Sequence, residues 1–146
     1  MVNILPFKRD YLPYVITVSL TNDCNLACPY CYVEKAKKYL DIETGKKIVD
    51  FAHKNLMIVR DKYKDILSQI VTYNNDHNLV STLNFFGGEP LLNFEVLRQM
   101  VEYAEITYPN DFFFTITTNG ILLNDNICSF LKQHKIHITI SCDGIK

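Results

Sequence analysis

The chain has 146 residues, of which 48% are hydrophobic and 21% charged, and its formal net charge is −1. This length suits one domain with a proper core, and the composition excludes an intrinsically disordered protein. The near-neutral charge argues against nucleic-acid binding, and no apolar run is long enough to span a membrane. The first residues, MVNILPFKRDYLPYV, lack the layout of a signal peptide, so we expect a cytoplasmic protein.

Strand-like and helix-like segments alternate along the chain. Residues 14–21, YVITVSLT, are rich in β-branched residues and predict a strand that runs into a cysteine-rich segment. Apolar residues recur at helical spacing from Glu43 to about Arg60 and predict a helix. Residues 61–78 either extend that helix or form a second one before a polar loop. Residues 1–13 are interpreted as a lead-in to the domain.

The second half of the chain continues this alternation. Asn93 is a candidate N-cap for its first helix, which stops at Pro109. The predicted elements cover residues 81–90 (strand), 94–108 (helix), 112–120 (strand), 124–135 (helix) and 136–144 (strand). The resulting order is β-α-β-α-β-α-β, with strands that look apolar on both faces. This pattern predicts an α/β fold with about four parallel strands, buried on both sides and joined by crossover helices.

Each predicted strand ends in a polar loop: TNDCNLACPYCY, FGGEP, TTNG and SCDG. In parallel α/β sheets and barrels, ligands bind at the carboxyl ends of the strands, on the loops that lead to the next helices. The packing of a core does not require such polar loops. We therefore expect the four loops to form one site at one edge of the sheet.

Three of the five cysteines, Cys24, Cys28 and Cys31, form a C-x3-C-x2-C pattern. In a reducing compartment, clustered cysteines are more often metal ligands than disulfides, and an odd total cannot pair completely. Structural zinc prefers four ligands, whereas this chain has a single C-x2-C pair and no paired histidines. A cubane iron–sulfur cluster normally takes four thiolates, so three would leave one iron open to a substrate or cofactor. The other two, Cys128 and Cys142, are interpreted as small buried hydrophobic residues.

The segment CNLACPYC resembles the signature of radical S-adenosylmethionine (radical SAM) enzymes, including the aromatic residue before the last cysteine. FFGGEPLL over residues 85–92 resembles the Gly-Gly-Glu-Pro motif on the second strand of that family, and TTNG and ISCDG resemble the segments that follow. The motif set is most similar to the peptide- and protein-modifying SPASM subgroup, which includes anaerobic sulfatase-maturating enzymes. The resemblance implies a partial TIM barrel of (β/α) units, here incomplete.

The resemblance also implies roles for individual residues. Cys24, Cys28 and Cys31 would each ligate one iron of a [4Fe–4S] cluster, and the fourth iron would bind the amino and carboxylate groups of S-adenosylmethionine (SAM). The implied SAM contacts are Tyr30 near the adenine, Gly87, Gly88 and Glu89 near the methionyl amine, Asn119, and Ser141 near the carboxylate or ribose. Two of these have plainer alternatives, because Tyr30 can be a loop-packing residue and Asn119 a turn residue.

The implied reaction is reductive cleavage of SAM. The reduced cluster passes one electron to the sulfonium, and SAM splits into methionine and a 5′-deoxyadenosyl radical that abstracts hydrogen from a C–H bond. The resemblance implies a peptide or protein substrate and a reductant such as flavodoxin or ferredoxin. Nucleic acid and membranes are not expected as partners.

The chain stops at SCDGIK, where family members commonly continue with an Arg that contacts the cofactor. Residues 14–146 are therefore interpreted as a radical SAM core truncated after its fourth strand, and the chain as a fragment. The alternative belongs to a different class: a truncated, catalytically incompetent module that only holds an iron–sulfur cluster.

Overall fold

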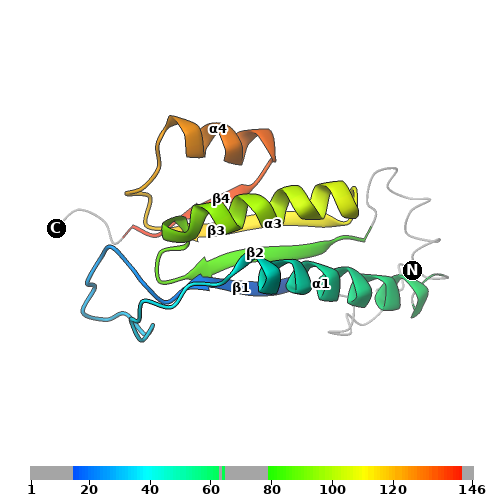
Figure 1. Ribbon diagram of the computed structural model, residues 1–146, viewed down its shortest axis with the longest axis horizontal. Coiled ribbons are helices and arrows are strands. Elements are labelled where there is room, and N and C mark those ends of the chain that lie inside the picture. Colours follow the sequence, from blue (N-terminus) through cyan, green and yellow to red (C-terminus); the bar gives the residue numbers. More distant parts are fainter. Residues whose placement is uncertain (1–14, 63, 65–78, 143–146) are drawn as a thin grey trace, which may run out of the picture.

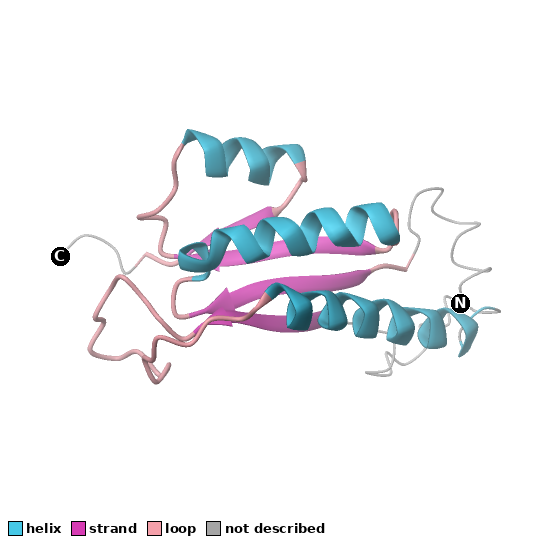
Figure 2. Ribbon diagram, viewed as in Figure 1, coloured by secondary structure: helices cyan, strands magenta, loops and turns pink. Residues whose placement is uncertain are grey.

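The computed structural model describes residues 15–62, 64 and 79–142. The predicted lead-in over 1–13, residues 65–78 of the ambiguous stretch, and the end of the last predicted strand at 143–144 lie outside the described residues. Within them, strands and helices alternate, and the helices gather on one side of a single sheet (Figures 1 and 2).

All four strands lie in one sheet in chain order, and each neighbouring pair is parallel, which confirms the predicted α/β fold. The strands are β1 (Val15–Thr21), β2 (Ser81–Gly87), β3 (Phe112–Thr118) and β4 (His137–Ile140). They are linked by α1 (Ile42–Lys62), by the short 3-10 helix η2 (Pro90–Asn93) followed by α3 (Phe94–Thr107), and by α4 (Asp125–Gln133). None of the described helices is long and apolar enough to cross a membrane.

Asn93 joins elements more than it caps a helix. It occupies the N-cap position of α3, as predicted, but its side chain makes no cap hydrogen bond. Its Nδ2 instead donates to the carbonyls of Leu20, at 3.0 Å, and Leu40, at 2.9 Å. The start of α3 is thereby tied to the end of β1 and to the segment before α1.

The core lies between the helices and one face of the sheet. The strand residues with the lowest exposure on this face alternate along the chain, and they pack against buried residues of α1 and α3. They include Val18, Leu20, Leu83, Phe85, Phe114 and Ile116. The intervening strand residues, such as Thr17, Asn84 and Thr115, point to the other face and are half-buried or exposed. The expectation that these strands are buried on both sides is therefore wrong for the described chain, because threonine favours strands without being apolar.

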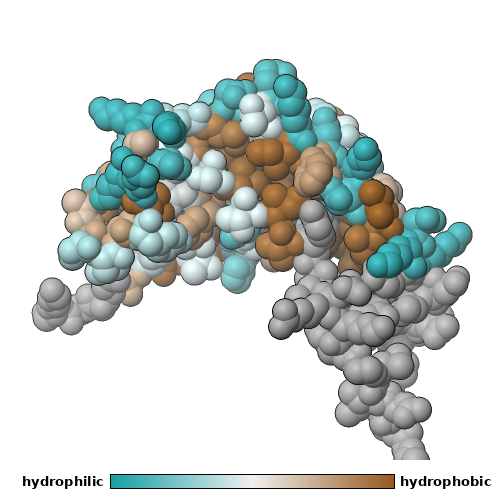
Figure 3. Space-filling model, turned by 90° about the horizontal axis from the view of Figure 1, so that it is seen from below, coloured by the Kyte–Doolittle hydropathy of each residue, from teal (hydrophilic) through white to brown (hydrophobic). Residues whose placement is uncertain are grey.

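The side of the molecule formed by β1 and α1 is rich in hydrophobic residues (Figure 3). Val15, Phe51 and Ile58 are each more than half exposed there. On the opposite side, β4 is an edge of the described sheet, and all four of its residues are exposed.

The expected burial of Cys128 and Cys142 is wrong, since both are exposed. Cys128 lies on α4, where Ile127 and Leu131 form the buried face. Residues at positions i and i+4 share one face of a helix, and Cys128 is turned away from it. Cys142 follows the exposed strand β4.

Candidate functional site

The three clustered cysteines lie on one loop that leaves β1 and returns to the same edge of the sheet. Its two ends are held together, because the N–H of Asn22 donates to the carbonyl of Lys38 at 3.1 Å and Thr21 forms an isolated antiparallel β-bridge with Tyr39. We call residues 22–38 the cysteine loop. These contacts between its two ends fix the position of the loop at the carboxyl edge of the sheet.

The thiols of the cysteine loop are accessible and unpaired. Cys24 and Cys28 are half-buried, Cys31 is exposed, and none of them is in a disulfide. The sulfur of Cys24 accepts hydrogen bonds from the backbone N–H of Leu26 at 3.4 Å and from Nδ2 of Asn119 at 4.0 Å. Donors of this kind stabilise the negative charge of a thiolate.

This donor set fits an iron–sulfur cluster better than a single metal ion. Within residues 15–62 and 79–142, no three His, Cys, Asp or Glu side chains are placed to share one ion. A structural zinc would need four such ligands at one point. In a [4Fe–4S] cluster each thiolate binds a different iron, so three free thiols spaced along one loop suit it.

Gly87 and Gly88 allow β2 to approach the start of the cysteine loop. The N–H of Gly88 donates to the carbonyl of Thr21 and that of Glu89 to the carbonyl of Asp23, both at 2.8 Å. A Cβ on either glycine would lie 2.2 Å from one of these carbonyl oxygens. Gly87 also has φ +139°, a conformation that residues with a side chain rarely adopt. The Gly-Gly pair is therefore required by the contact between two backbones.

Glu89 is the buried centre of this edge. Its side chain is fully buried, and one carboxylate oxygen accepts from the N–H of Leu91 at 3.0 Å and the hydroxyl of Thr118 at 2.7 Å. The other oxygen accepts from the N–H of Asn119 at 2.9 Å. Glu89 thus joins the ends of β2 and β3. These contacts orient the loops after β2 and β3, whereas the resemblance implies a place for Glu89 near the methionyl amine.

Asn119 acts in a turn and also contacts the cysteine loop. Its Oδ1 accepts from the N–H of Ile121 at 3.0 Å, and its Nδ2 donates to Oδ1 of Asn25 at 2.8 Å. Ser141 reaches the same edge, because its N–H donates to the carbonyl of Thr118 at 2.9 Å. The loops after β1, β2, β3 and β4 therefore meet at one edge of the sheet.

Two tyrosines of the cysteine loop extend into the surroundings. Tyr30 is 65% exposed and Tyr32 is 82% exposed. The ring of Tyr32 stacks on Phe86 of β2, with the ring centroids 6.5 Å apart. The sequence interpretation singled out Tyr30 alone, although the aromatic residue after Cys31 was visible in the same motif.

Asp23 is a further residue that the sequence interpretation missed. Its carboxylate accepts from the N–H of Cys24 at 2.9 Å and from the hydroxyl of Tyr39 at 2.6 Å. The hydrogen bond from Tyr39 is the main cause that lowers the pKa of Asp23, and the same bond raises the pKa of Tyr39. An ionised carboxylate thus fixes the backbone at the first cysteine. Its position directly before Cys24 was the signal in the sequence.

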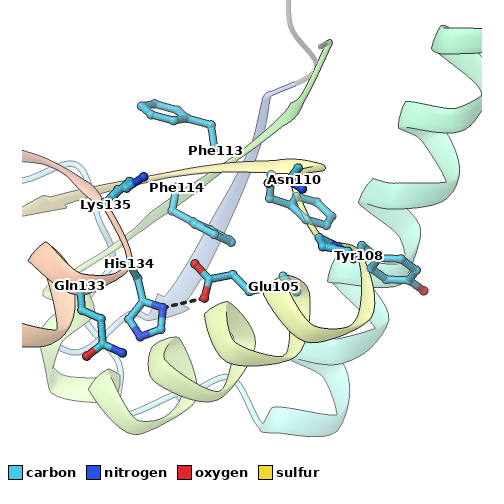
Figure 4. A pocket seen from close by; sticks show the side chains of 11 residues that line it. Glu105, Tyr108, Asn110, Phe113, Phe114, Gln133, His134 and Lys135 are labelled. Carbon is cyan, nitrogen blue, oxygen red and sulfur yellow. Dashed lines mark hydrogen bonds and ion pairs between the residues drawn. The ribbon is translucent and has the colours of Figure 1, made fainter. Parts of the chain in front are cut away.

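A pocket of about 500 Å³ lies elsewhere, where the ends of α3 and α4 meet the start of β3 (Figure 4). His134 and Glu105 approach each other there, with 2.7 Å between Nδ1 and Oε2. None of the sequence-predicted site residues lines this pocket. It lies at the amino edge of the sheet, away from the cysteine loop.

In a comparison with models of protein families, the radical SAM superfamily matches residues 18–146 of the chain. Among curated proteins, the chain is 32% identical to an uncharacterized protein of Methanocaldococcus jannaschii, over 90% of this chain and 39% of that protein. It is 28% identical to the cysteine-type anaerobic sulfatase-maturating enzyme of Clostridium novyi, over 86% of this chain and 31% of the enzyme. It is 31% identical to GTP 3′,8-cyclase of Clostridium acetobutylicum, over 94% of this chain and 36% of the cyclase.

The fold also resembles that of a solved structure, native anSMEcpe with bound AdoMet and Cp18Cys peptide. The TM-score is 0.67 at 24% identity, over 92% of this chain and 33% of that one. The chain thus spans about a third of the length of the proteins it matches. Together with the family match over most of the chain, these comparisons establish that the chain belongs to the radical SAM superfamily, whose enzymes use a [4Fe–4S] cluster and S-adenosylmethionine.

Proposed function

We propose that this chain forms the cofactor-holding part of a radical SAM enzyme that acts on a peptide or protein substrate. The observation that carries this proposal is the clamped cysteine loop. Three free thiols lie on a loop whose start is bonded to the Gly-Gly-Glu segment at the end of β2, and a buried carboxylate bonds that segment to the end of β3.

The residues have separate tasks in this proposal. Cys24, Cys28 and Cys31 hold three irons of the cluster. The backbone before them is fixed by Asp23, whose carboxylate accepts from the N–H of Cys24 and whose carbonyl accepts from the N–H of Glu89. Tyr30, Gly87, Gly88, Asn119 and Ser141 form the surroundings of SAM. The N–H of Gly88 donates to the end of β1 and that of Glu89 to the start of the cysteine loop, so both groups position this loop, and contacts to SAM in this segment are made by other atoms.

The bound cluster and SAM would supply a 5′-deoxyadenosyl radical, formed when one electron from an external reductant cleaves SAM to methionine. The protein contributes orientation and shielding. A reductant of the flavodoxin or ferredoxin class belongs to the proposal. So does a cytoplasmic location, because the thiols must remain reduced to bind iron.

Two relatives suggest different substrates. One is named a sulfatase-maturating enzyme and another a GTP 3′,8-cyclase. We favour the peptide or protein substrate, because the strands of this chain offer no cation for a triphosphate. No Lys or Arg occurs in β1, β2, β3 or β4.

Anaerobic reconstitution with iron and sulfide tests the proposal. We expect about four irons per chain and an electron paramagnetic resonance (EPR) signal of the reduced cluster that shifts when SAM is added. Cys24→Ser, Cys28→Ser and Cys31→Ser should each lose most of the iron. Cys128→Ser is the matched control, because Cys128 is an exposed cysteine on α4, and it should retain the full iron content.

The other outcomes are equally informative. A cluster whose signal ignores SAM would point to the incompetent cluster-holding module. Stoichiometric zinc with no cluster, or equal iron loss in Cys128→Ser, would contradict the assignment of the cysteine loop as the cluster site.

A further inference from the structure

Asn25 and Asn119 join the cysteine loop to the end of β3 by a hydrogen bond between their side chains. Nδ2 of Asn119 donates to Oδ1 of Asn25 at 2.8 Å, across 94 positions of the sequence. Asn25 directly follows the first cysteine, and Asn119 directly follows β3, at the end of the sheet where Figure 1 shows the cysteine loop. We call these two residues the asparagine pair.

The amide of Asn119 is oriented by the fold independently of the cysteine loop. Its Oδ1 accepts from the N–H of Ile121 at 3.0 Å, which forms a turn closed by the side chain. The backbone N–H of Asn119 donates to the buried carboxylate of Glu89 at 2.9 Å. Since both the backbone and the amide oxygen are fixed, the direction of the Nδ2 group toward the loop is fixed as well.

Both members of the asparagine pair also contact the sulfur of Cys24. Its Sγ lies 4.0 Å from Nδ2 of Asn119 and 3.9 Å from Oδ1 of Asn25. A thiol can donate its hydrogen to this oxygen, whereas a thiolate that binds iron has no hydrogen and only accepts. Nδ2 of Asn119 has two hydrogens, one for the oxygen of Asn25 and one for the thiolate. Without Asn119, the amide oxygen and the thiolate would face each other with no donor from β3.

Hydrogen bonds to cysteine sulfur change the redox behaviour of an iron–sulfur cluster. They stabilise the reduced form, which is the more negative one, and therefore raise the reduction potential. The backbone N–H of Leu26, at 3.4 Å from the same sulfur, is a second donor of this kind. Cys24 and Asn119 are half-buried, and a hydrogen bond is electrostatically stronger there than in water.

We propose that Asn119 is a positioning residue that is held by Asn25, donates to the Cys24 thiolate and raises the reduction potential of the cluster. The inference rests on the proposed function for the presence of that cluster. It differs from the contact with SAM that the resemblance implies, because both hydrogens of Nδ2 are committed to the cysteine loop. A higher potential lets an external reductant of given strength reduce a larger fraction of the cluster.

A redox titration of the anaerobically reconstituted chain, followed by EPR without SAM, tests the asparagine pair. In Asn119→Ala the ratio of reduced to oxidised cluster at a fixed solution potential should fall about fivefold, because the thiolate loses a donor. Asn119→Ser keeps a hydroxyl that can accept from the N–H of Ile121, and it should shift the potential in the same direction. Asn126→Ala, at an exposed position of α4, is the matched control and should keep the parent potential.

The coupling within the pair is measured by repeating the Asn119→Ala change in a chain that also carries Asn25→Ala. The shift should be clearly smaller there, for two reasons. The Asn119 amide has lost the partner that orients it, and its removal no longer leaves an amide oxygen facing the thiolate.

An unchanged potential in both Asn119→Ala and Asn119→Ser would overturn the role of Asn119. An Asn119→Ala shift of the same size with and without Asn25 would overturn the role of the pair. A cluster whose EPR signal responds to SAM while these potentials stay unchanged would contradict this inference and leave the proposed function intact. The expected shifts in a chain whose EPR signal ignores SAM would support the asparagine pair and contradict the proposed function.

Discussion

The two edges of the sheet both contain anchored carboxylates, but these anchor different groups. At the carboxyl edge, buried Glu89 accepts from two backbone N–H groups and one hydroxyl. Where α1 meets the amino edge, carboxylates bind side chains instead. Asp111 contacts Arg60 at 2.7 Å and His53 at 2.9 Å, and Asp50 accepts from two tyrosine hydroxyls.

The carboxylate at the carboxyl edge positions the loops of the candidate site, whereas those near the amino edge stabilise the fold. No buried side-chain N or O atom of the described residues lacks a partner, so the polar groups are satisfied at both edges. At the amino edge the partners are other side chains, whereas at the carboxyl edge the buried carboxylate is used to place loops. The thiols of the cysteine loop remain accessible. Barrels of this class generally carry chemistry at the carboxyl edge and stability at the other.

Removing the buried carboxylate should produce the largest effect. Glu89→Ala leaves three donors without an acceptor, and each unsatisfied buried donor costs about 1–3 kcal/mol. We expect the free energy of unfolding to fall by about 3 kcal/mol or more, as measured by denaturant titration. The cysteine loop also loses its link to β3, so reconstituted iron content should fall.

Asp111→Ala is the counterpart at the amino edge. It breaks the contacts with Arg60 and His53, which are partly exposed, and should cost about 2 kcal/mol. Iron content should remain at the parent level. Equal iron loss in both variants would mean that the two edges are not separate in function.

A smaller effect is expected from adding a methyl group at Gly88, where the end of β2 contacts the start of the cysteine loop. In Gly88→Ala the new Cβ lies 2.2 Å from the Asp23 carbonyl, so one backbone must move. Such overpacking costs about 1–3 kcal/mol and should displace the cysteine loop. Gly45→Ala is the matched control, because its closest neighbour is the flexible side chain of Met100 at 2.8 Å, and alanine favours helices. If Gly88→Ala keeps full stability and iron content, the close approach is not required.

The sequence predicted the architecture well because its signals were local. Strand-helix alternation and helical spacing located the four described strands and the helices α1, α3 and α4 to within a few residues, whereas the short helix η2 was not predicted. The polar loops at the strand ends predicted that the candidate site lies at one edge of the sheet, because the carboxyl ends of parallel strands all lie at the same edge. The ends of the strands were less predictable. The strand predicted over 81–90 ends at Gly87, because Glu89 begins η2 by accepting from the N–H of Leu91.

The errors arose where a residue's role depends on distant partners. The segment FFFTITT predicts a strand that is buried on both faces. Thr115 and Thr117 are only half-buried, because their burial depends on which face of the sheet the helices cover. Asn93 looks like a helix cap, but its partners are carbonyls more than fifty positions away. The link from Glu89 to Thr118 spans 29 positions and has no periodic signal in the sequence.

The smallest expected effect is a pH dependence from the seam between α1 and α3. The hydrogen bond from Tyr108 to Asp50 raises the pKa of Tyr108 to about 12, from an ordinary value of 10.0. Because the folded state binds this proton more tightly than the unfolded state, its contribution is complete below pH 10 and is lost as the pH rises to about 12. We therefore expect the thermal unfolding midpoint to fall across this range, and to fall less steeply in Tyr108→Phe.

A Tyr39→Phe variant, at the opposite edge, should keep the Tyr108 contribution to the slope. If Tyr108→Phe gives the same slope as the parent chain, the bond to Asp50 does not set the alkaline limit of the amino edge.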